Sequence, residues 1–391
     1  MVTQSSDRAD ARSGAAAWAR PPVLAGYTYA PDEAYRARDA DRLLAIRLET
    51  NRTCNLRCRY CYAESGVDAD AVAPYEVLVD RVDQAYELGA ASIVVIGGGE
   101  PTIHPRFRDL IDYIHRRGMV PMVFSNGLAI DADLAGFLFD RGASVMTKLD
   151  SLRPDRQDYL AGMAGAYDRI RRGLDHLLSA GFDRPDDPGR LRLGASFVSC
   201  RLNRDEIADI WRFCRQRRIF PNMEVLTPTG RAKESLPDQG LETGEIQQYK
   251  FGLLDLDREE FACDWLPYTP LAGSGCLQHL YSLYVTLEGN IRPCAPTKFD
   301  EHPALQVNGT YPYNTNVMTL REIHASSLFR YVRHIDAHLE GKCGGCEHLD
   351  ECIGCRGYAY AVGVNAGKPP RVALRGECLQ CAKPAAGTTT P

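Results

Sequence analysis

The sequence predicts an α/β fold that contains a parallel sheet, and three observations support this. Between residues 43 and 227, short apolar runs alternate with amphipathic stretches. In the first of these stretches Leu78, Val82 and Tyr86 recur at helical spacing, which is typical of a helix that covers a sheet. Polar or glycine-rich clusters directly follow the first four apolar runs, at the strand ends where parallel α/β folds carry their working residues.

Six apolar runs are candidates for buried strands. They span residues 43–49, 92–96, 119–124, 143–149, 191–198 and 222–226. Stretches with helical periodicity lie between them, so this part of the chain is expected to contain six βα units. Six units are too few for a complete eight-stranded barrel.

Length, charge and composition exclude several classes of protein. The 391 residues can bury a sizeable core and suffice for a two-part architecture. A net charge of -5 gives no basic excess for coating nucleic acid, and no run approaches the roughly 18 apolar residues that cross a membrane. The N-terminal residues lack the apolar core of a secretory signal. Fourteen cysteines without such a signal indicate a reducing compartment, so we expect a cytoplasmic protein.

Composition divides the chain into five expected parts. Residues 1–41 should be disordered to about residue 21 and then wrap onto the main domain. Residues 42–230 carry the βα units, and residues 231–270 read as a linker with one helix. Eight of the fourteen cysteines lie in residues 271–381, which defines a second, metal-dependent module. Residues 382–391 have the composition of a disordered tail.

Three cysteines follow the first predicted strand at spacings that suit an iron–sulfur cluster. Cys54, Cys58 and Cys61 are separated by three and then two residues. Such a loop can bind three irons of a [4Fe–4S] cluster and leave the fourth iron without a protein ligand. A structural zinc site is the alternative, but zinc needs four ligands, and this loop offers no fourth cysteine or histidine.

This loop, with Asn55 and Leu56 inside it and Tyr60 before its last cysteine, resembles the signature of the radical S-adenosylmethionine (SAM) superfamily. The resemblance implies an open, partial (β/α)6 barrel that binds a [4Fe–4S] cluster and SAM. It also implies a 5′-deoxyadenosyl radical that abstracts a hydrogen atom from the substrate. An electron donor such as flavodoxin or ferredoxin is then an expected partner, whereas nucleic acid and membrane are not.

The resemblance implies further contacts to SAM at the strand ends. Gly98, Gly99 and Glu100 would hold the methionine amino group, with a tight βα turn as the alternative for this stretch. Tyr60 would lie near the adenine.

Two later strand ends carry less specific candidates. Ser125 and Asn126 would contact the ribose or carboxylate of SAM, or form a satisfied turn. For Lys148 and Asp150, one of the two would contact SAM or substrate, or the pair would form a structural salt bridge.

The second set of cysteines resembles the SPASM extension of radical SAM enzymes, through a Gly-x4-Cys element at Gly289 and paired cysteines downstream. The resemblance implies two auxiliary [4Fe–4S] clusters, which makes three in all. The ligands expected for the first are Cys263, Cys276, Cys294 and Cys355, with Cys263 as the candidate fourth ligand. The ligands expected for the second are Cys343, Cys346, Cys352 and Cys378.

One spacing departs from the SPASM pattern, because two residues rather than three separate Cys352 from Cys355. The assignment of Cys355 is therefore less secure, and Cys381 is an alternative ligand. Paired cysteines at this spacing also suit zinc ribbons, which are the competing interpretation of the whole module.

Cys200 follows the fifth predicted strand and has two interpretations. It is either a buried core cysteine or a thiol that donates a hydrogen atom to a substrate radical, as an epimerase requires.

The leading functional prediction is a radical SAM oxidoreductase whose auxiliary clusters accept the second electron. Ala295 follows Cys294 where sulfatase maturases carry an acidic base, and the N-terminal segment is short for a leader-peptide-binding domain. Both features favour a small natural-product intermediate, such as an amino sugar or aminocyclitol, that is dehydrogenated or epimerised. A maturase acting on a ribosomal peptide or protein is the first alternative, and a non-catalytic zinc or iron–sulfur scaffold is the second.

Overall fold

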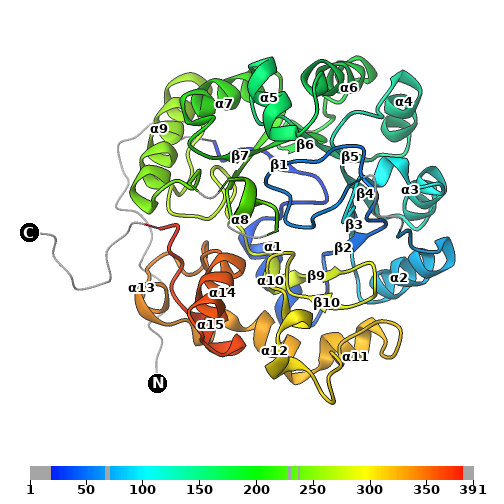
Figure 1. The fold of residues 1–391 in the computed structure, drawn as a ribbon, viewed down its shortest axis with the longest axis vertical. Helices are drawn as coiled ribbons and strands as arrows, with labels where there is room; N and C mark the ends of the chain where they lie inside the picture. The colour runs from blue at the N-terminus through cyan, green and yellow to red at the C-terminus, as the bar shows by residue number, and fades with distance from the viewer. Residues whose placement is uncertain (1–18, 67–70, 228–229, 237, 382–391) are drawn as a thin grey trace, which may run out of the picture.

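A single curved sheet organises the fold. The computed structural model describes residues 19–66, 71–227, 230–236 and 238–381. Within them eight strands form one sheet in the order β10-β9-β2-β3-β4-β5-β7-β8. The sheet curves into a partial barrel with helices around its outer face, as Figure 1 shows. The predicted tail 382–391 and most of the predicted disordered N-terminal segment lie outside the described residues.

The six predicted strands are confirmed, and their bounds differ from the expected ones by at most two residues. They are β2 (Ala45–Glu49), β3 (Ser92–Ile96), β4 (Val120–Phe124), β5 (Ser144–Lys148), β7 (Leu193–Ser199) and β8 (Phe220–Val225). All neighbouring pairs among them are parallel. The α/β fold class, a partial (β/α)6 barrel followed by a cysteine-rich region, is therefore confirmed.

Side-chain alternation along the strands separates two apolar layers. Ile46 and Leu48 of β2 belong to the main core cluster between the sheet and its helices. Ala45 belongs instead to a second cluster inside the barrel, to which most of the other strands also contribute. The members of this inner cluster are Leu24, Tyr27, Ala45, Val94, Met122, Met146, Leu191 and Phe220.

The helices that cover the sheet bury one face each. They are α2 (Tyr75–Glu87), α3 (Phe107–Arg116), α4 (Ala132–Asp140), α5 (Pro154–Ala161), α6 (Ala166–Ala180), α7 (Ile207–Gln216) and α9 (Thr243–Phe261). In α3 the buried residues are Phe107, Leu110, Ile111 and Ile114, which share one helical face. The Asp131 side chain caps α4 by accepting a 2.8 Å hydrogen bond from the Leu134 amide.

The cysteine-rich region continues the barrel sheet. Its strand β9 (Ser282–Val285) pairs in parallel with β2, and β10 (Ile291–Arg292) pairs antiparallel with β9. The two parts expected from the sequence thus share one sheet. The remaining helices of this region are α10 (Gln278–Tyr281), α11 (Leu320–Ala325), α12 (Ser327–Arg333), α13 (Gly341–Gly344), α14 (Arg356–Asn365) and α15 (Pro370–Arg375).

The described part of the N-terminal segment packs along the barrel. Its strand β1 (Val23–Leu24) pairs with β6 (Arg190–Leu191), and the Tyr29 hydroxyl lies 2.8 Å from Ser92 Oγ at the start of β3. After it, α1 (Pro31–Asp39) reaches the C-terminal region, where the Arg38 guanidinium forms a 2.6 Å ion pair with Asp336. Among the described residues, no helix is both long and apolar enough to span a membrane.

We predict that buried His324 of α11 makes the protein less stable in mild acid. Burial, reinforced by the nearby Arg333 charge, lowers the pKa of His324 from 6.5 to about 4. Between these pH values the unfolded chain binds a proton that the folded chain does not, so stability falls as pH falls below 6.5. The slope from one such histidine is about 1.4 kcal/mol per pH unit.

His324→Phe should remove this share of the pH dependence, because Nε2 of His324 has no hydrogen-bond partner among the described residues. Denaturant unfolding of wild type and variant at several pH values between 5.5 and 7 measures the difference. If the unfolding free energies of the two proteins changed equally with pH, the prediction would be wrong.

Candidate active site

A cavity of about 240 Å³ opens at the C-terminal ends of the barrel strands. Cys54, Cys58 and Cys61 form part of its wall, and the glycine loop after β3 forms another part. Ser125 follows β4 and also lines the cavity. The motifs predicted at separate strand ends are thus brought to one place, as expected for a parallel α/β fold.

The thiols of Cys54 and Cys58 in this wall must lose their protons to bind a metal. Burial raises the pKa of Cys54 to about 11 and that of Cys58 to about 12, so both carry protons at neutral pH unless a metal displaces them. Cys54 Sγ accepts a hydrogen bond from the Leu56 amide at 3.4 Å. Donors of this kind also stabilise thiolates bound to iron–sulfur clusters.

The same three cysteines do not fit one mononuclear ion. In the described part of the chain, no three His, Cys, Asp or Glu side chains gather closely enough to hold a single metal ion. The residues of a [4Fe–4S] cluster each bind a different iron, so they stand further apart than ligands of one zinc. The described residues thus offer no mononuclear zinc site at Cys54, Cys58 and Cys61.

The glycine loop is held against the cysteine loop by its backbone. The Gly99 amide donates to the Asn51 carbonyl at 2.7 Å, and the Glu100 amide donates to the Thr53 carbonyl at 2.9 Å. A Cβ atom at Gly99 would lie 1.9 Å from the Thr53 oxygen, so a side chain is excluded there. Gly98 has ordinary contact distances around its missing side chain, so close approach does not require glycine at 98.

The Glu100 carboxylate is committed to neighbouring protein groups. One oxygen accepts from Ser125 Oγ at 2.8 Å and from the Thr102 side chain and backbone. The other oxygen accepts from the Asn126 amide at 2.7 Å. Burial raises the pKa of Glu100, and these donors oppose that rise by favouring the charged form. Glu100 thus joins the ends of β3 and β4.

Asn126 reaches the cysteine loop itself. Its side-chain nitrogen donates to the Asn55 side-chain oxygen at 2.7 Å and lies 3.8 Å from Cys54 Sγ. Both Ser125 and Asn126 are largely buried and line the cavity. They are therefore both turn residues and part of the wall, the two interpretations that the sequence left open.

Tyr60, Lys148 and Asp150 contact one another at the cavity wall. The Tyr60 hydroxyl donates to Asp150 at 2.5 Å, and the Lys148 ammonium lies 3.6 Å from the same carboxylate and 4.3 Å from the Tyr60 ring centroid. Burial and the Asp150 charge raise the pKa of Tyr60 well above its usual value. Tyr60 and Lys148 line the cavity, whereas the fully buried Asp150 holds them in place from behind.

A second cavity of about 220 Å³ extends from the first toward the cysteine-rich region. It is lined by Cys276, Cys294 and Cys355. Gly357 in the first turn of α14 lies so close to Cys294 that a Cβ atom there would be 3.0 Å from Cys294 Sγ. These three cysteines are therefore brought together as the sequence predicted.

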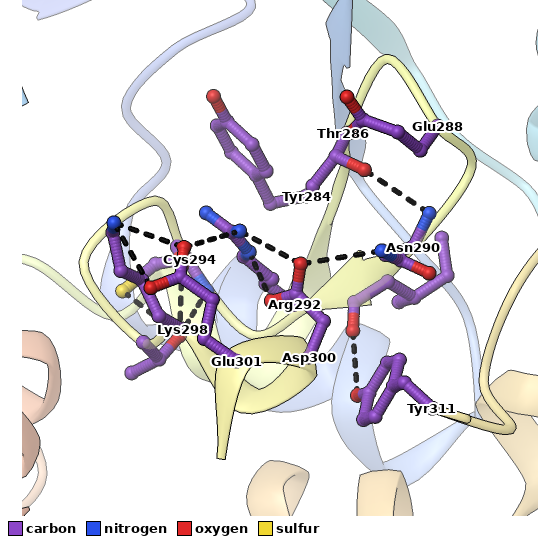
Figure 2. A network of polar contacts seen from close by, with 12 residues as sticks. Tyr284, Thr286, Glu288, Asn290, Arg292, Cys294, Lys298, Asp300, Glu301 and Tyr311 are labelled. Atoms are coloured by element: carbon purple, nitrogen blue, oxygen red, sulfur yellow. Dashed lines mark hydrogen bonds and ion pairs between the residues drawn. The ribbon is translucent and has the colours of Figure 1, made fainter. Parts of the chain in front are cut away.

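A polar network supports the turn that carries Cys294 (Figure 2). Arg292 of β10 forms ion pairs with Asp300 at 2.5 Å and with Glu301 at 3.3 Å. Thr297 Oγ1 accepts from the Cys294 amide at 2.9 Å and lies 3.6 Å from Cys294 Sγ. The side-chain network and the turn fix the position of this thiol.

A third cavity carries the other predicted cysteine set. Cys343, Cys346, Cys352 and Cys378 line it, together with Cys381. Backbone amides donate to three sulfurs near it, from Cys378 to Cys343 Sγ at 3.4 Å, from Gly354 to Cys352 Sγ at 3.3 Å and from Cys355 to Cys378 Sγ at 3.2 Å. Such donors fit metal-bound thiolates. As an alternative ligand, Cys381 would serve this set and not the set at Cys355.

Residues 48–214 match the family model of the radical SAM superfamily. The chain carries a radical SAM domain. The AdoMet-dependent heme synthase of Methanosarcina barkeri is 24% identical over 352 residues, which cover 83% of this chain and 93% of that protein. The mycofactocin maturase MftC of Mycobacterium tuberculosis is 25% identical over 353 residues, which cover 88% of this chain and 84% of that protein. A chain that carries this domain is an enzyme, and both relatives are named as enzymes.

Solved structures agree with this fold. SuiB of Streptococcus suis, bound to S-adenosylmethionine, superposes with a TM-score of 0.65 at 16% identity, covering 89% of this chain and 80% of that one. The enzyme anSMEcpe, with bound AdoMet and the Cp18Cys peptide, has a TM-score of 0.59 at 16% identity, covering 81% of this chain and 90% of that one. In both cases the similarity extends well beyond the radical SAM domain.

The positions of two single cysteines do not support the functional roles that were considered for them. Cys263 does not line the cavity of Cys276, Cys294 and Cys355; it follows α9, and the Arg215 and Asp257 charges act on its thiol. The helix end at Ala262 turns it toward the residue 19 backbone. Its predicted role as fourth ligand is therefore withdrawn.

Cys200 takes the first of its two interpretations, a buried core cysteine. It is 1% exposed and packs among Leu160, Leu226 and Leu236. It does not line the first or the second cavity, because the strand ends at Ser199 and the next residue turns into the core. Cys200 is a core cysteine, so the hydrogen-donor hypothesis has no geometric support.

Sequence reasoning missed Arg47, Glu224 and Tyr284, which line the second cavity from β2, β8 and β9. Glu224 lines the first cavity as well. The signal for Arg47 was a charged residue inside an otherwise apolar run, which in a barrel strand points inward when its neighbours point to the helices. Strand β9 was not predicted, so Tyr284 carried no comparable signal.

We predict that Glu100→Gln destabilises the junction between β3 and β4. The new amide nitrogen would face hydrogen-bond donors such as the Asn126 amide or Ser125 Oγ, which leaves a buried donor without an acceptor. The expected loss is about 1–3 kcal/mol of folding free energy, measured by denaturant unfolding. Glu87→Gln, at an exposed position of α2, is the matched control. Equal stability of the two variants would contradict this role of Glu100.

We predict that Cys276→Ala lowers the iron content of anaerobically purified protein, whereas Cys263→Ala leaves it unchanged. Removing one thiol from a set of three should release a cluster or reduce its occupancy. The thiol of Cys263 lies outside all three cysteine-lined cavities. Iron and sulfide analysis compares the variants, and an equal loss of iron would return Cys263 to the ligand set.

Proposed function

We propose that this radical SAM enzyme removes a hydrogen atom from a peptide substrate bound between its cysteine-lined cavities. The observation that carries the proposal is the continuity of the first two cavities, which share six lining residues. These are Tyr62, Ile96, Phe124, Glu224, Val225 and Thr227. A substrate in this shared space would lie between Cys58 on one side and Cys294 on the other.

In this proposal Cys54, Cys58 and Cys61 hold a [4Fe–4S] cluster, and the loop of Gly98 and Gly99 contributes to the SAM site. The bound cluster and SAM supply a one-electron reductive cleavage that can activate an inert C–H bond. The residues of this chain position the substrate and keep water out of the cavity. Tyr62, Phe124 and Ile96 form a largely apolar wall that excludes water and holds one C–H bond in place.

The cysteine sets of the second and third cavities would hold two auxiliary clusters. Cys276, Cys294 and Cys355 would hold the nearer one, and Cys343, Cys346, Cys352 and Cys378 the further one. A net two-electron oxidation of the substrate needs an acceptor for the second electron. Clusters placed beside the substrate space can serve as that acceptor, and flavodoxin or ferredoxin would supply the electron for SAM.

A peptide substrate is favoured over an amino sugar for a specific reason. MftC is named as a maturase, and SuiB has been solved with its precursor peptide SuiA. Neither relative in sequence reported above is named for an amino sugar or aminocyclitol.

We predict that the anaerobically reconstituted enzyme, given dithionite and SAM, releases 5′-deoxyadenosine, and that Cys58→Ala reduces release to background. Cys214→Ala is the control, because Cys214 is a buried core residue of α7. Chromatography of the quenched reaction measures the product. Equal release from wild type and Cys58→Ala would show that the three cysteines are not the radical site.

The substrate class is tested by isotope transfer with deuterated peptides and deuterated aminocyclitols in parallel reactions. Deuterium that enters 5′-deoxyadenosine from a peptide supports the proposal. Deuterium transferred from an aminocyclitol instead would overturn the peptide assignment while leaving the radical SAM chemistry in place.

A further inference from the structure

Arg47 is a cation on the inner face of the barrel. It lies in the middle of β2, in register with Val94 of β3 and with Tyr284 of β9. Ala45, two residues earlier on the same face, belongs to the inner apolar cluster, so Arg47 stands one layer above that cluster. From there its side chain lines the second cavity.

The Arg47 guanidinium has no anionic partner in the described part of the chain. None of the hydrogen bonds or ion pairs within residues 19–66, 71–227, 230–236 and 238–381 involves this group. Its aromatic contact is the Tyr27 ring, whose centroid lies 5.6 Å away. Arg47 is partly exposed and lines the cavity, so its guanidinium is available to an anion from outside the chain.

His279 is a second polar group that lacks a partner at the same cavity. It is 4% exposed, and its Nε2 forms no hydrogen bond with the described residues. Burial, with the charges of Arg356 and Arg47, lowers the pKa of His279 to about 3, so the ring is neutral and can still donate one hydrogen bond.

The carboxylate of Glu224 does not satisfy Arg47. Glu224 lines both cavities, and its side chain accepts from the Asn222 amide at 3.0 Å. No ion pair within 4 Å joins Glu224 to Arg47 among the described residues. A ligand in this cavity therefore meets a cation on β2 and a carboxylate on β8 that form no ion pair with each other among the described residues.

We propose that Arg47 binds a carboxylate of the substrate, an inference that rests on the proposed function. The planar guanidinium can donate two parallel hydrogen bonds to one carboxylate, which fixes orientation as well as position. Tyr27, Tyr284 and Phe124 line the same cavity and suit an apolar or aromatic body attached to that carboxylate. The anchored end lies toward Cys276, so the remainder of the substrate extends toward Cys58.

The alternative role for Arg47 is an electrostatic effect on an auxiliary cluster held by the nearby cysteines. Cys276 and Cys294 are among the groups that act on the Arg47 charge, so Arg47 is near enough to influence a cluster held there. The two roles differ in what they require. Carboxylate binding depends on the ligand's acid group, whereas a role toward the cluster changes its reduction potential without any ligand.

The test uses 3-phenylpropanoate and 3-phenylpropanamide, which share an aromatic body and differ in charge. Anaerobic equilibrium dialysis against the reconstituted enzyme with SAM measures the Kd of each. We expect wild type to bind the acid at least tenfold more tightly than the amide, and Arg47→Met to lose that preference. Arg47→Lys should keep part of it, and Arg36→Met, on the exposed side of α1, should keep all of it.

Two results would overturn the proposal. One is equal binding of acid and amide by wild type. The other is an unchanged acid preference in Arg47→Met, together with a shifted midpoint potential of an auxiliary cluster in a spectroscopic redox titration. Because dialysis does not require turnover, the binding result stands apart from 5′-deoxyadenosine release. Failure of the peptide assignment and failure of the Arg47 assignment are therefore distinguishable.

Discussion

Two backbone hydrogen bonds between neighbouring strand ends support the rest of the site. The amides of Gly99 and Glu100 donate to carbonyls of Asn51 and Thr53, which directly precede the first cysteine of the loop. This contact is as close as it is because residue 99 has no side chain. Glu100 then extends the connection to β4 through Ser125. The wall of cysteines is thus held by backbone and side-chain hydrogen bonds among three successive strand ends.

Much of the fold could be predicted from the sequence, because each barrel strand is a short apolar run followed by a helix with one buried face. The cysteine loop and the glycine loop were also recognisable, since both lie in contiguous stretches. Elements that depend on pairing with a strand far away in the sequence could not be predicted. Strand β9 has four residues and is defined by its partner β2, so its own sequence gave no periodic signal.

The positions of two single cysteines could not be predicted from the sequence, for a common physical reason. Cys200 directly follows a barrel strand, and the sequence does not reveal whether the chain continues toward the cavity or turns away. An Asn203 side chain accepts from the Cys200 amide at 2.9 Å and closes a turn that directs the thiol into the core. Cys263 has suitable chemistry, but the end of α9 places it elsewhere. In both cases the residue type indicated what the thiol could do, while the local backbone geometry decided whether the thiol reaches a cavity.

The pairing of β9 with β2 has a consequence for the integrity of the chain. Strand β2 carries Arg47 and leads into the cysteine loop, and its other edge is covered by a strand from the C-terminal region. A protein cut near residue 270 would leave the amides and carbonyls on that edge of β2 unpaired, which invites association with another chain. The cysteine-rich region is therefore not an exchangeable appendage. Any chimera that replaces it must supply a strand of matching register for the barrel to close on.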